Sequence, residues 1–211
     1  RHSANLLEHI RGSIVEGFHS VRGSAHMSAV VLQNCAMGVF FMGSYIVSIP
    51  LLIREVYAGS SAELSWVNGA NSLGLFLTIL LLLRFGDVKR QGRALLISQI
   101  AGSLCLIGAG LELGFASLIL FLFGWGLCGG IAMTMSRTIM QELAPDNQRA
   151  RMMAFYSFSF MGAGPLGALF CGFLVEGLGP STALLICPGL MLVFSITMSF
   201  KTSLWSLGKQ P

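Results

Sequence analysis

Six stretches of the chain contain no Asp, Glu, Lys or Arg, and apolar residues fill most of each one. They cover residues 28–53, 64–83, 94–111, 115–135, 152–174 and 182–200, so each is 18 to 26 residues long. Because an α-helix rises about 1.5 Å per residue, about 20 apolar residues cross the roughly 30 Å hydrocarbon layer of a bilayer. The pattern therefore predicts an all-α membrane protein whose six transmembrane helices form one domain over 28–200.

Two flanking segments lie outside that domain. Residues 1–27 contain an amphipathic pattern, in which Leu7, Ile10, Ile14 and Phe18 recur at steps of three and four. This pattern predicts a cytoplasmic linker helix on the membrane surface, and an ordinary solvated helix would fit its mixed charges equally well. Residues 201–211 are expected to form a cytoplasmic tail. Because the chain begins at Arg1 rather than Met, we expect a fragment of a longer protein.

The composition excludes several classes of soluble protein. Hydrophobic residues make up 54% of the chain and charged residues only 10%, and the mean hydropathy is +0.75. An ordinary soluble domain has about 25% charged residues, so this chain has too few to cover the surface of a soluble globule. We therefore exclude a cytosolic enzyme, a secreted disulfide scaffold and a nucleic-acid-binding domain.

The positive charges are distributed unevenly along the chain. Segments 1–27, 84–93, 136–151 and 201–211 contain 12 of the 13 Lys and Arg residues, and only Arg54 lies outside them. Cytoplasmic loops of membrane proteins carry an excess of Lys and Arg. The sequence therefore predicts a multi-pass protein of the cytoplasmic (inner) membrane with both termini in the cytoplasm.

The predicted helices lack the residues that intramembrane chemistry requires. All four His precede the first helix, and no Asp or Glu lies in any of the six. Rhomboid-like serine proteases and zinc proteases of the membrane need a buried His, and a proton-coupling group within the membrane is normally an acid or a His. The five cysteines lie in the helices without a CxxC pair, and we interpret them as packing residues. The sequence predicts no catalytic residue, no metal site and no cofactor.

The loop after the second predicted helix combines glycines with a carboxylate among basic residues. The candidates for a functional role in it are Gly86, Asp87, Arg90, Gly92 and Arg93. The carboxylate of Asp87 could pair with the basic side chains or lie at a helix N-terminus, and so form a latch that opens when the helices move. Alternatively, the basic residues only set the orientation of the chain.

The loop after the fourth predicted helix leads into a fifth helix rich in glycine. Pro145 is expected to end the preceding helix, and Asp146 or Asn147 to cap the next one, close to Arg149. Within the fifth helix, a hinge is predicted from Gly162, Gly164, Pro165 and Gly167. Gly164, Ala168 and Gly172 are four residues apart on one face, where small residues would permit close helix contact. Tight packing without bending is the alternative.

These features together resemble the C-terminal six-helix half of a major facilitator superfamily transporter, a fold of two inverted three-helix repeats. Residues 141–169 look most similar to the enterobactin-exporter-like branch, also called transmembrane secretion effectors. The resemblance implies that Gly86 to Arg93, and Pro145, Asp146 and Arg149, form cytoplasmic gating loops. The spacing from Asp87 to Gly92 is longer than in the usual motif, and Ala150 replaces a glycine.

The resemblance also implies a substrate cavity lined by the first and fourth helices and flanked by the second and fifth. Polar side chains at membrane depth face protein or water, which makes candidates of Gln33, Asn34, Asn68, Asn71, Thr134, Tyr156 and Ser159. For each of them, a hydrogen bond between helices that serves packing alone is the alternative.

The sequence thus favours a secondary active transporter that exports a small molecule, such as a siderophore, drug or metabolite, by alternating access. Its partners would be the lipid bilayer, the substrate, and either the N-terminal six-helix half or a second copy of this chain. A non-transporting six-helix scaffold and an importer on the same fold are the alternatives, because one architecture hosts many functions.

Overall fold

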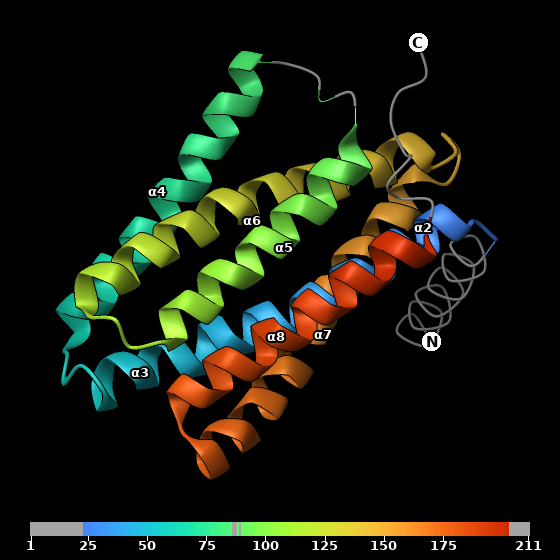
Figure 1. Cartoon of the computed structure of the whole chain (residues 1–211). Helices are drawn as coiled ribbons and strands as arrows, with labels where there is room; N and C mark the ends of the chain where they lie inside the picture. Colours follow the sequence, from blue (N-terminus) through green and yellow to red (C-terminus); the bar gives the residue numbers. More distant parts are fainter. Residues whose placement is uncertain (1–22, 86–87, 89, 203–211) are drawn as a thin grey trace, which may run out of the picture.

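The computed structural model describes residues 23–85, 88 and 90–202. This part of the chain forms six helices that are long and apolar enough to cross a membrane (Figure 1). The first spanning helix, Ala25–Glu55, comprises α2 (Ala25–Met37), η1 (Gly38–Met42), η2 (Ser44–Ser48) and α3 (Ile49–Glu55). The others are α4 (Ser61–Phe85), α5 (Gln91–Gly110), α6 (Phe115–Leu143), α7 (Arg149–Leu178) and α8 (Pro180–Lys201).

The middle of the first spanning helix is wound as a π-helix in η1 and η2. The hydroxyl of Ser44 donates to the carbonyl oxygen of Phe40 at 2.7 Å within this stretch. Pro50 follows directly in the first turn of α3 and has no N–H to donate to the preceding turn. π-Helical turns are rare and often occur at functional sites. The centre of the first spanning helix is therefore a candidate part of the functional site.

Most helices extend a few residues beyond the charge-free stretches of the sequence. α6 continues past Arg137 to Leu143, and α7 continues past Glu176 to Leu178. A charged side chain limits how deeply a residue enters lipid, but it does not interrupt the backbone hydrogen bonds of a helix. Of residues 175–181, which separate the fifth and sixth charge-free stretches, only Gly179 therefore lies outside a helix, and its φ of 84° is a conformation that favours glycine.

Two further turns show how the sequence sets helix ends. At the start of α4, the carboxylate of Glu63 accepts from the backbone N–H of Ser60 at 2.7 Å, and the Ser60 hydroxyl accepts from the N–H of Ala62 at 3.2 Å. This reciprocal pattern is a capping box. Between α5 and α6, the short turn ends at Gly114, with a φ of 109°, and joins these helices in a tight hairpin.

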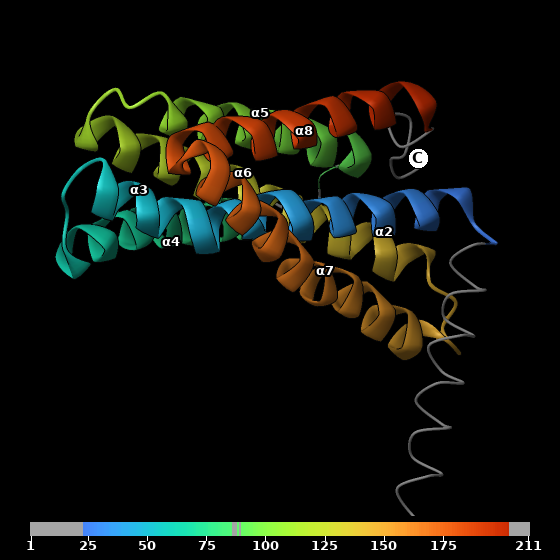
Figure 2. The same cartoon turned by 90° about the horizontal axis from the view of Figure 1, so that it is seen from below.

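The packing of the helices repeats within the bundle. The first spanning helix packs on α7 through η1 and η2, and α6 packs on α4 in the same way. α5 packs on α6, α8 packs on the first spanning helix, and α5 and α8 pack on each other. If the first spanning helix is exchanged with α6, α4 with α7, and α5 with α8, the same pairs result. This is the arrangement expected of two three-helix repeats. Figure 2 shows α7 crossing the first spanning helix, with the N-terminal end of α7 diverging from α2.

Glycines bring the paired helices into close contact. A Cβ atom added at Gly167 of α7 would lie 2.7 Å from the Cα of Val39, and one at Gly43 would lie 2.6 Å from the carbonyl carbon of Gly167. On the other side of the bundle, a Cβ at Gly74 would lie 2.9 Å from the backbone nitrogen of Leu127. Because no larger residue fits at these positions, the backbones of the two helices approach each other directly.

The predicted contact face of α7 was wrong. A Cβ atom at Gly164 or Gly172 would meet nothing within 4 Å, so the face with Gly164, Ala168 and Gly172 is not the one in close helix contact. The contact face instead includes Ala163, which lies near Gly38, and Gly167. Spacing reveals which small residues share a face, but which face meets a neighbour depends on how the helices are placed.

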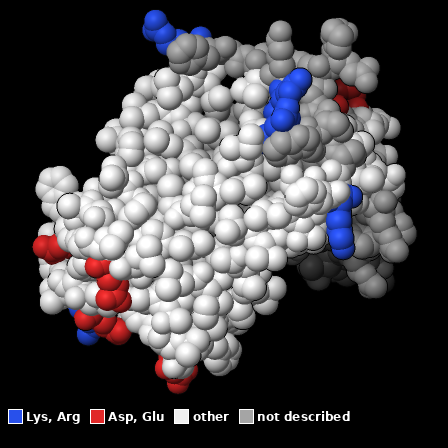
Figure 3. All heavy atoms as spheres, viewed as in Figure 1, with Lys and Arg blue, Asp and Glu red and all other residues white. Residues whose placement is uncertain are grey.

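The charges of the described residues gather at the two ends of the bundle. The basic end carries Arg84, Arg90, Arg93, Arg137, Arg149, Arg151 and Lys201 together with Glu142 and Asp146, and the acidic end carries Glu55, Glu63, Glu112 and Glu176 together with Arg54. Figure 3 shows a broad uncharged surface between these ends. Such a belt is what the hydrocarbon layer of a bilayer requires.

Candidate substrate site

A cavity of about 180 Å³ lies where four helices converge at the middle of their lengths. It is lined by Met37, Phe41, Met42, Tyr45, Asn71, Leu75, Trp125, Gly126, Gly129, Met133 and Phe160. The first spanning helix and α6 supply eight of these residues, α4 supplies two, and α7 supplies Phe160. We call it the central cavity. The first and fourth helices thus line it and the second and fifth flank it.

Aromatic rings form one wall of the central cavity. The ring centroid of Trp125 lies 5.2 Å from that of Tyr45 and 6.0 Å from that of Phe41, with interplanar angles of 40° and 88°. The phenol hydroxyl of Tyr45 donates to the side-chain oxygen of Asn68 at 2.9 Å. Ring pairs at these separations attract each other beyond their burial of apolar area, so the wall is held in a defined geometry.

Asn71 lies beside the central cavity because α4 and α6 touch there. A Cβ atom at Gly126 would lie 3.0 Å from the carbonyl carbon of Asn71. The side-chain amide of Asn71 donates one of its two N–H groups to the carbonyl oxygen of Leu122 on α6, at 3.2 Å. Its side-chain oxygen accepts no hydrogen bond from a described residue and remains available to a ligand.

Four of the predicted polar candidates lie instead inside the bundle, in hydrogen bonds between helices. The side-chain amide of Asn34 donates to the Tyr156 carbonyl oxygen and to the Ser159 hydroxyl, each at 2.9 Å. The Tyr156 hydroxyl in turn donates to Ser136 at 2.9 Å. Asn34, Tyr156 and Ser159 are buried, as is Ser136 on α6, so these hydrogen bonds tie the first spanning helix to α7 and α7 to α6.

Gln33 is the fourth of these buried candidates, and it joins three helices. Its side-chain amide donates to the side-chain oxygen of Gln99 on α5 and, at 2.9 Å, to the hydroxyl of Ser195 on α8. Both glutamines are 1% exposed. The side-chain oxygen of Gln33 and the side-chain nitrogen of Gln99 have no partner among the described residues, so this network is only partly satisfied.

Comparison with known protein families shows to which family the chain belongs. The sequence model described as "Major Facilitator Superfamily" matches residues 32–204. The chain belongs to the major facilitator superfamily. It is therefore a multi-pass membrane transporter of small molecules and not an enzyme. No curated protein and no solved structure shows significant similarity to the chain.

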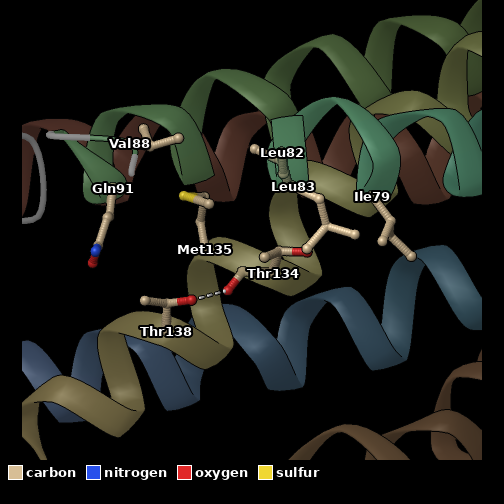
Figure 4. Close-up of a pocket in the computed structure, with 8 residues that line it drawn as sticks. All are labelled: Ile79, Leu82, Leu83, Val88, Gln91, Thr134, Met135 and Thr138. Atoms are coloured by element: carbon tan, nitrogen blue, oxygen red, sulfur yellow. Dashed lines mark hydrogen bonds between the residues drawn. The ribbon is translucent and has the colours of Figure 1, made fainter. Parts of the chain in front are cut away.

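A second cavity of this transporter, of about 320 Å³, lies nearer the basic end between α4, α5 and α6. Figure 4 shows Thr134 on α6 beside Leu83 of α4, Thr138 one turn further along α6, and Gln91 at the start of α5. The predicted candidate Thr134 thus lines this second cavity, and its carbonyl oxygen accepts from the Thr138 hydroxyl at 2.8 Å. Helices α4 and α6, which touch near Gly126, are separated here.

The structure describes only part of the predicted first gating loop. Gly86 and Asp87 lie outside the described residues. Arg90 is exposed directly before α5, while Gly92 is buried within its first turn and Arg93 is half-buried. The side-chain amide of Gln91, which the sequence did not single out, donates to the carboxylate of Glu142 at 3.1 Å. This bond joins the start of α5 to the end of α6.

The second predicted gating loop contains an ion pair rather than a capping contact. Asp146 lies 3.1 Å from Arg149, and their side chains are 93% and 52% exposed. The residue before α7 is Gln148, and no side chain caps the helix there, so the expected cap from Asp146 or Asn147 was wrong. Such exposed pairs contribute about 0–1 kcal/mol. Pro145 follows the end of α6 by two residues.

The predicted hinge lies in a helix that stays continuous. α7 contains Pro165 in its interior and extends unbroken from Arg149 to Leu178. Gly164 and Pro165 border a groove of about 250 Å³ with Met42 and Ile46 of the first spanning helix. Gly162 is exposed and meets only the ring of Phe158. Of the predicted hinge residues, Gly167 alone lies in a close backbone contact.

The sequence did not single out most of the residues that line the central cavity. It directed attention to polar side chains, whereas the lining is chiefly aromatic and sulfur-containing. The combination of Gly124, Trp125 and Gly126 at the middle of the fourth helix was a usable signal, because small residues beside a large ring permit both close packing and a cavity.

The cysteines form pairs that sequence spacing did not reveal. The thiol of Cys105 on α5 lies close enough to that of Cys128 on α6 to interact with it, and the thiol of Cys171 on α7 likewise lies close to that of Cys187 on α8. Ser48 lies 3.0 Å from Cys171 and extends the second pair to the first spanning helix. Among the described residues, no group of three or more His, Cys, Asp and Glu side chains is placed to hold a metal ion.

Proposed function

We propose that this chain is the second six-helix half of a secondary transporter that exports small molecules from the cytoplasm by alternating access. The central cavity carries the proposal. It lies at the middle of the spanning helices and is lined mainly by the first and fourth of them. In transporters built from repeats, the substrate site lies near the bilayer midplane at the interface between repeats, and one part rocks against the other.

The exposed apolar surfaces of the two helices that flank the central cavity support the proposal that another six-helix unit forms its second wall. α4 exposes Leu73, Phe76, Leu80 and Leu83, and α7 exposes Phe158, Met161, Leu166, Leu169 and Phe173. Only 17% of the apolar part of α4 is buried, against 56% in the first spanning helix. These surfaces are suited to contact with lipid and with another six-helix unit, which would be the N-terminal half of the same protein or a second copy.

The charge distribution supports an orientation. The basic end would face the cytoplasm and the acidic end the outside, because Lys and Arg favour cytoplasmic loops. Both termini would then be cytoplasmic, and the membrane would be the inner membrane. The Asp and Glu residues of the chain all lie outside the six apolar stretches, so none is expected at membrane depth. If protons drive export, the proton-coupling residue would lie in the six-helix unit that forms the second wall of the cavity.

The direction of transport is tested without knowing the substrate. The small molecules in cells and in the medium are compared by mass spectrometry, with and without the full gene product. Export predicts at least one compound enriched in the medium and depleted in the cells, and the same compound should accumulate in everted membrane vesicles. Accumulation in right-side-out vesicles would support the importer, and no transported compound in either would support the scaffold.

The proposed gating loop leads to a prediction for Asp87. Asp87→Asn removes a negative charge among Arg84, Lys89, Arg90 and Arg93, so we expect slower export and normal membrane insertion. The measurement is the initial rate of vesicle transport at equal protein level. Glu176→Gln, which removes an exposed carboxylate at the acidic end, is the matched control and should leave the rate unchanged. Equal rates for Asp87→Asn and the original chain would eliminate the latch.

A further inference from the structure

We propose that the central cavity binds a planar aromatic group that carries no negative charge. This inference deepens the proposed function, because it names the class of substrate that the transport site takes. It is carried by three properties of the cavity: the rings that line it, its size, and its charge.

The lining offers π-surfaces from several directions. Trp125 stands against Tyr45 and Phe41, and Phe160 reaches the cavity from α7. Met37, Met42 and Met133 complete the lining with polarisable sulfur. Aromatic rings favour offset-stacked or edge-to-face partners, and methionine sulfur makes favourable contacts with ring edges. A flat aromatic guest would find both kinds of contact.

The size of the cavity sets the size of the guest. A cavity of about 150 Å³ in a protein interior accommodates benzene. The central cavity, at about 180 Å³ and open on one side, therefore has room for one ring or a small fused pair. A larger substrate would place its ring there and extend the rest of the molecule toward the second wall.

The charge of the cavity excludes anions. None of the lining residues is charged, and the charged side chains of the described chain gather at the two ends of the bundle. An unpaired carboxylate at this depth would lose its hydration without gaining a counter-charge. A cation would instead be attracted to the ring faces, and a neutral donor could bond to the free side-chain oxygen of Asn71.

The test measures binding to the full gene product in lipid nanodiscs, with empty nanodiscs as background. The probes are 2-naphthol, its saturated counterpart decahydro-2-naphthol, and the anion 2-naphthoate. We expect 2-naphthol to bind about 2- to 10-fold more tightly than the saturated alcohol, because only it can use ring contacts. We expect 2-naphthoate to bind at least about tenfold more weakly than 2-naphthol.

Variants assign the preference to the cavity. Trp125→Leu should remove most of the preference for 2-naphthol over the saturated alcohol, because Trp125 is the ring that contacts both Tyr45 and Phe41, while retaining binding of the saturated alcohol, which also shows that the variant is folded. Trp125→Phe keeps a ring and should keep part of the preference. Trp66→Leu is the matched control, because Trp66 is exposed on α4 outside the cavity, and it should change neither affinity.

The outcomes separate this inference from the proposed function. Equal binding of 2-naphthol and its saturated counterpart, tight binding of 2-naphthoate, or the same loss in Trp66→Leu as in Trp125→Leu would overturn the aromatic assignment. Export of some compound without an aromatic preference would leave the proposed function in place and contradict this inference. Aromatic binding that depends on Trp125, without transport in any vesicle, would support this inference and contradict the exporter.

Discussion

Replacing Gly167 by alanine should lower the free energy of unfolding by about 1–3 kcal/mol, the cost of overfilling a packed contact. The added Cβ would lie 2.7 Å from the Cα of Val39 and closer still to its carbonyl oxygen. Since these atoms belong to the backbone, they cannot move aside by changing a rotamer. The first spanning helix and α7 would have to separate along their crossing.

The same helix supplies a control with the opposite expected sign. Gly172 lies five residues further along α7, and a Cβ atom there would meet nothing within 4 Å. Gly172→Ala should be neutral or stabilising by up to about 1 kcal/mol, because alanine has the higher helix propensity. The measurement is thermal unfolding in detergent, followed by a thiol-reactive dye that reaches the buried Cys187 on unfolding. Equal midpoints for the two variants would contradict the observed crossing.

Replacing Gln33 by leucine should lower the free energy of unfolding by about 1–2 kcal/mol. The change removes the donor to Gln99 and Ser195 and leaves Gln99 buried without a hydrogen-bond partner from Gln33. The double variant Gln33→Leu with Gln99→Leu should recover most of this loss, because it removes the stranded polar group as well.

The pair forms a double-mutant cycle measured by the same unfolding assay. Thr197→Val on α8 is the control, because Thr197 is exposed and its hydroxyl bonds only to the Val193 carbonyl oxygen of its own helix. That variant should change the midpoint little. Losses from Gln33→Leu and Gln99→Leu that simply add would show that the two amides do not depend on each other.

The hydrophobic pattern predicted the six helices well because membrane helices depend on local properties. Every backbone hydrogen bond of a spanning helix lies within its own segment, and lipid requires that all of them form. The tight turn before α6 was likewise predictable from its length. The ends were less predictable, since α6 and α7 continue through Arg137 and Glu176 without regard to charge.

The candidate site was predictable only in part. The sequence named Asn71 as a candidate for the substrate cavity, and in the structure Asn71 lines the central cavity. The same reasoning also named Asn34, which is buried against Ser159. Both are asparagines at membrane depth, so their local sequence does not distinguish a cavity wall from a contact between helices.

The sequence by itself determined the class of the protein, the number of its helices and the asymmetry of its charge, because these follow from the composition of short segments. The tertiary structure decided that Gly167 rather than Gly164 forms the helix contact, that four cysteines form two pairs, and that Trp125 stands among the rings of a cavity. The physical reason is that each of these depends on the rotation and crossing of one helix against another, which packing between distant segments sets.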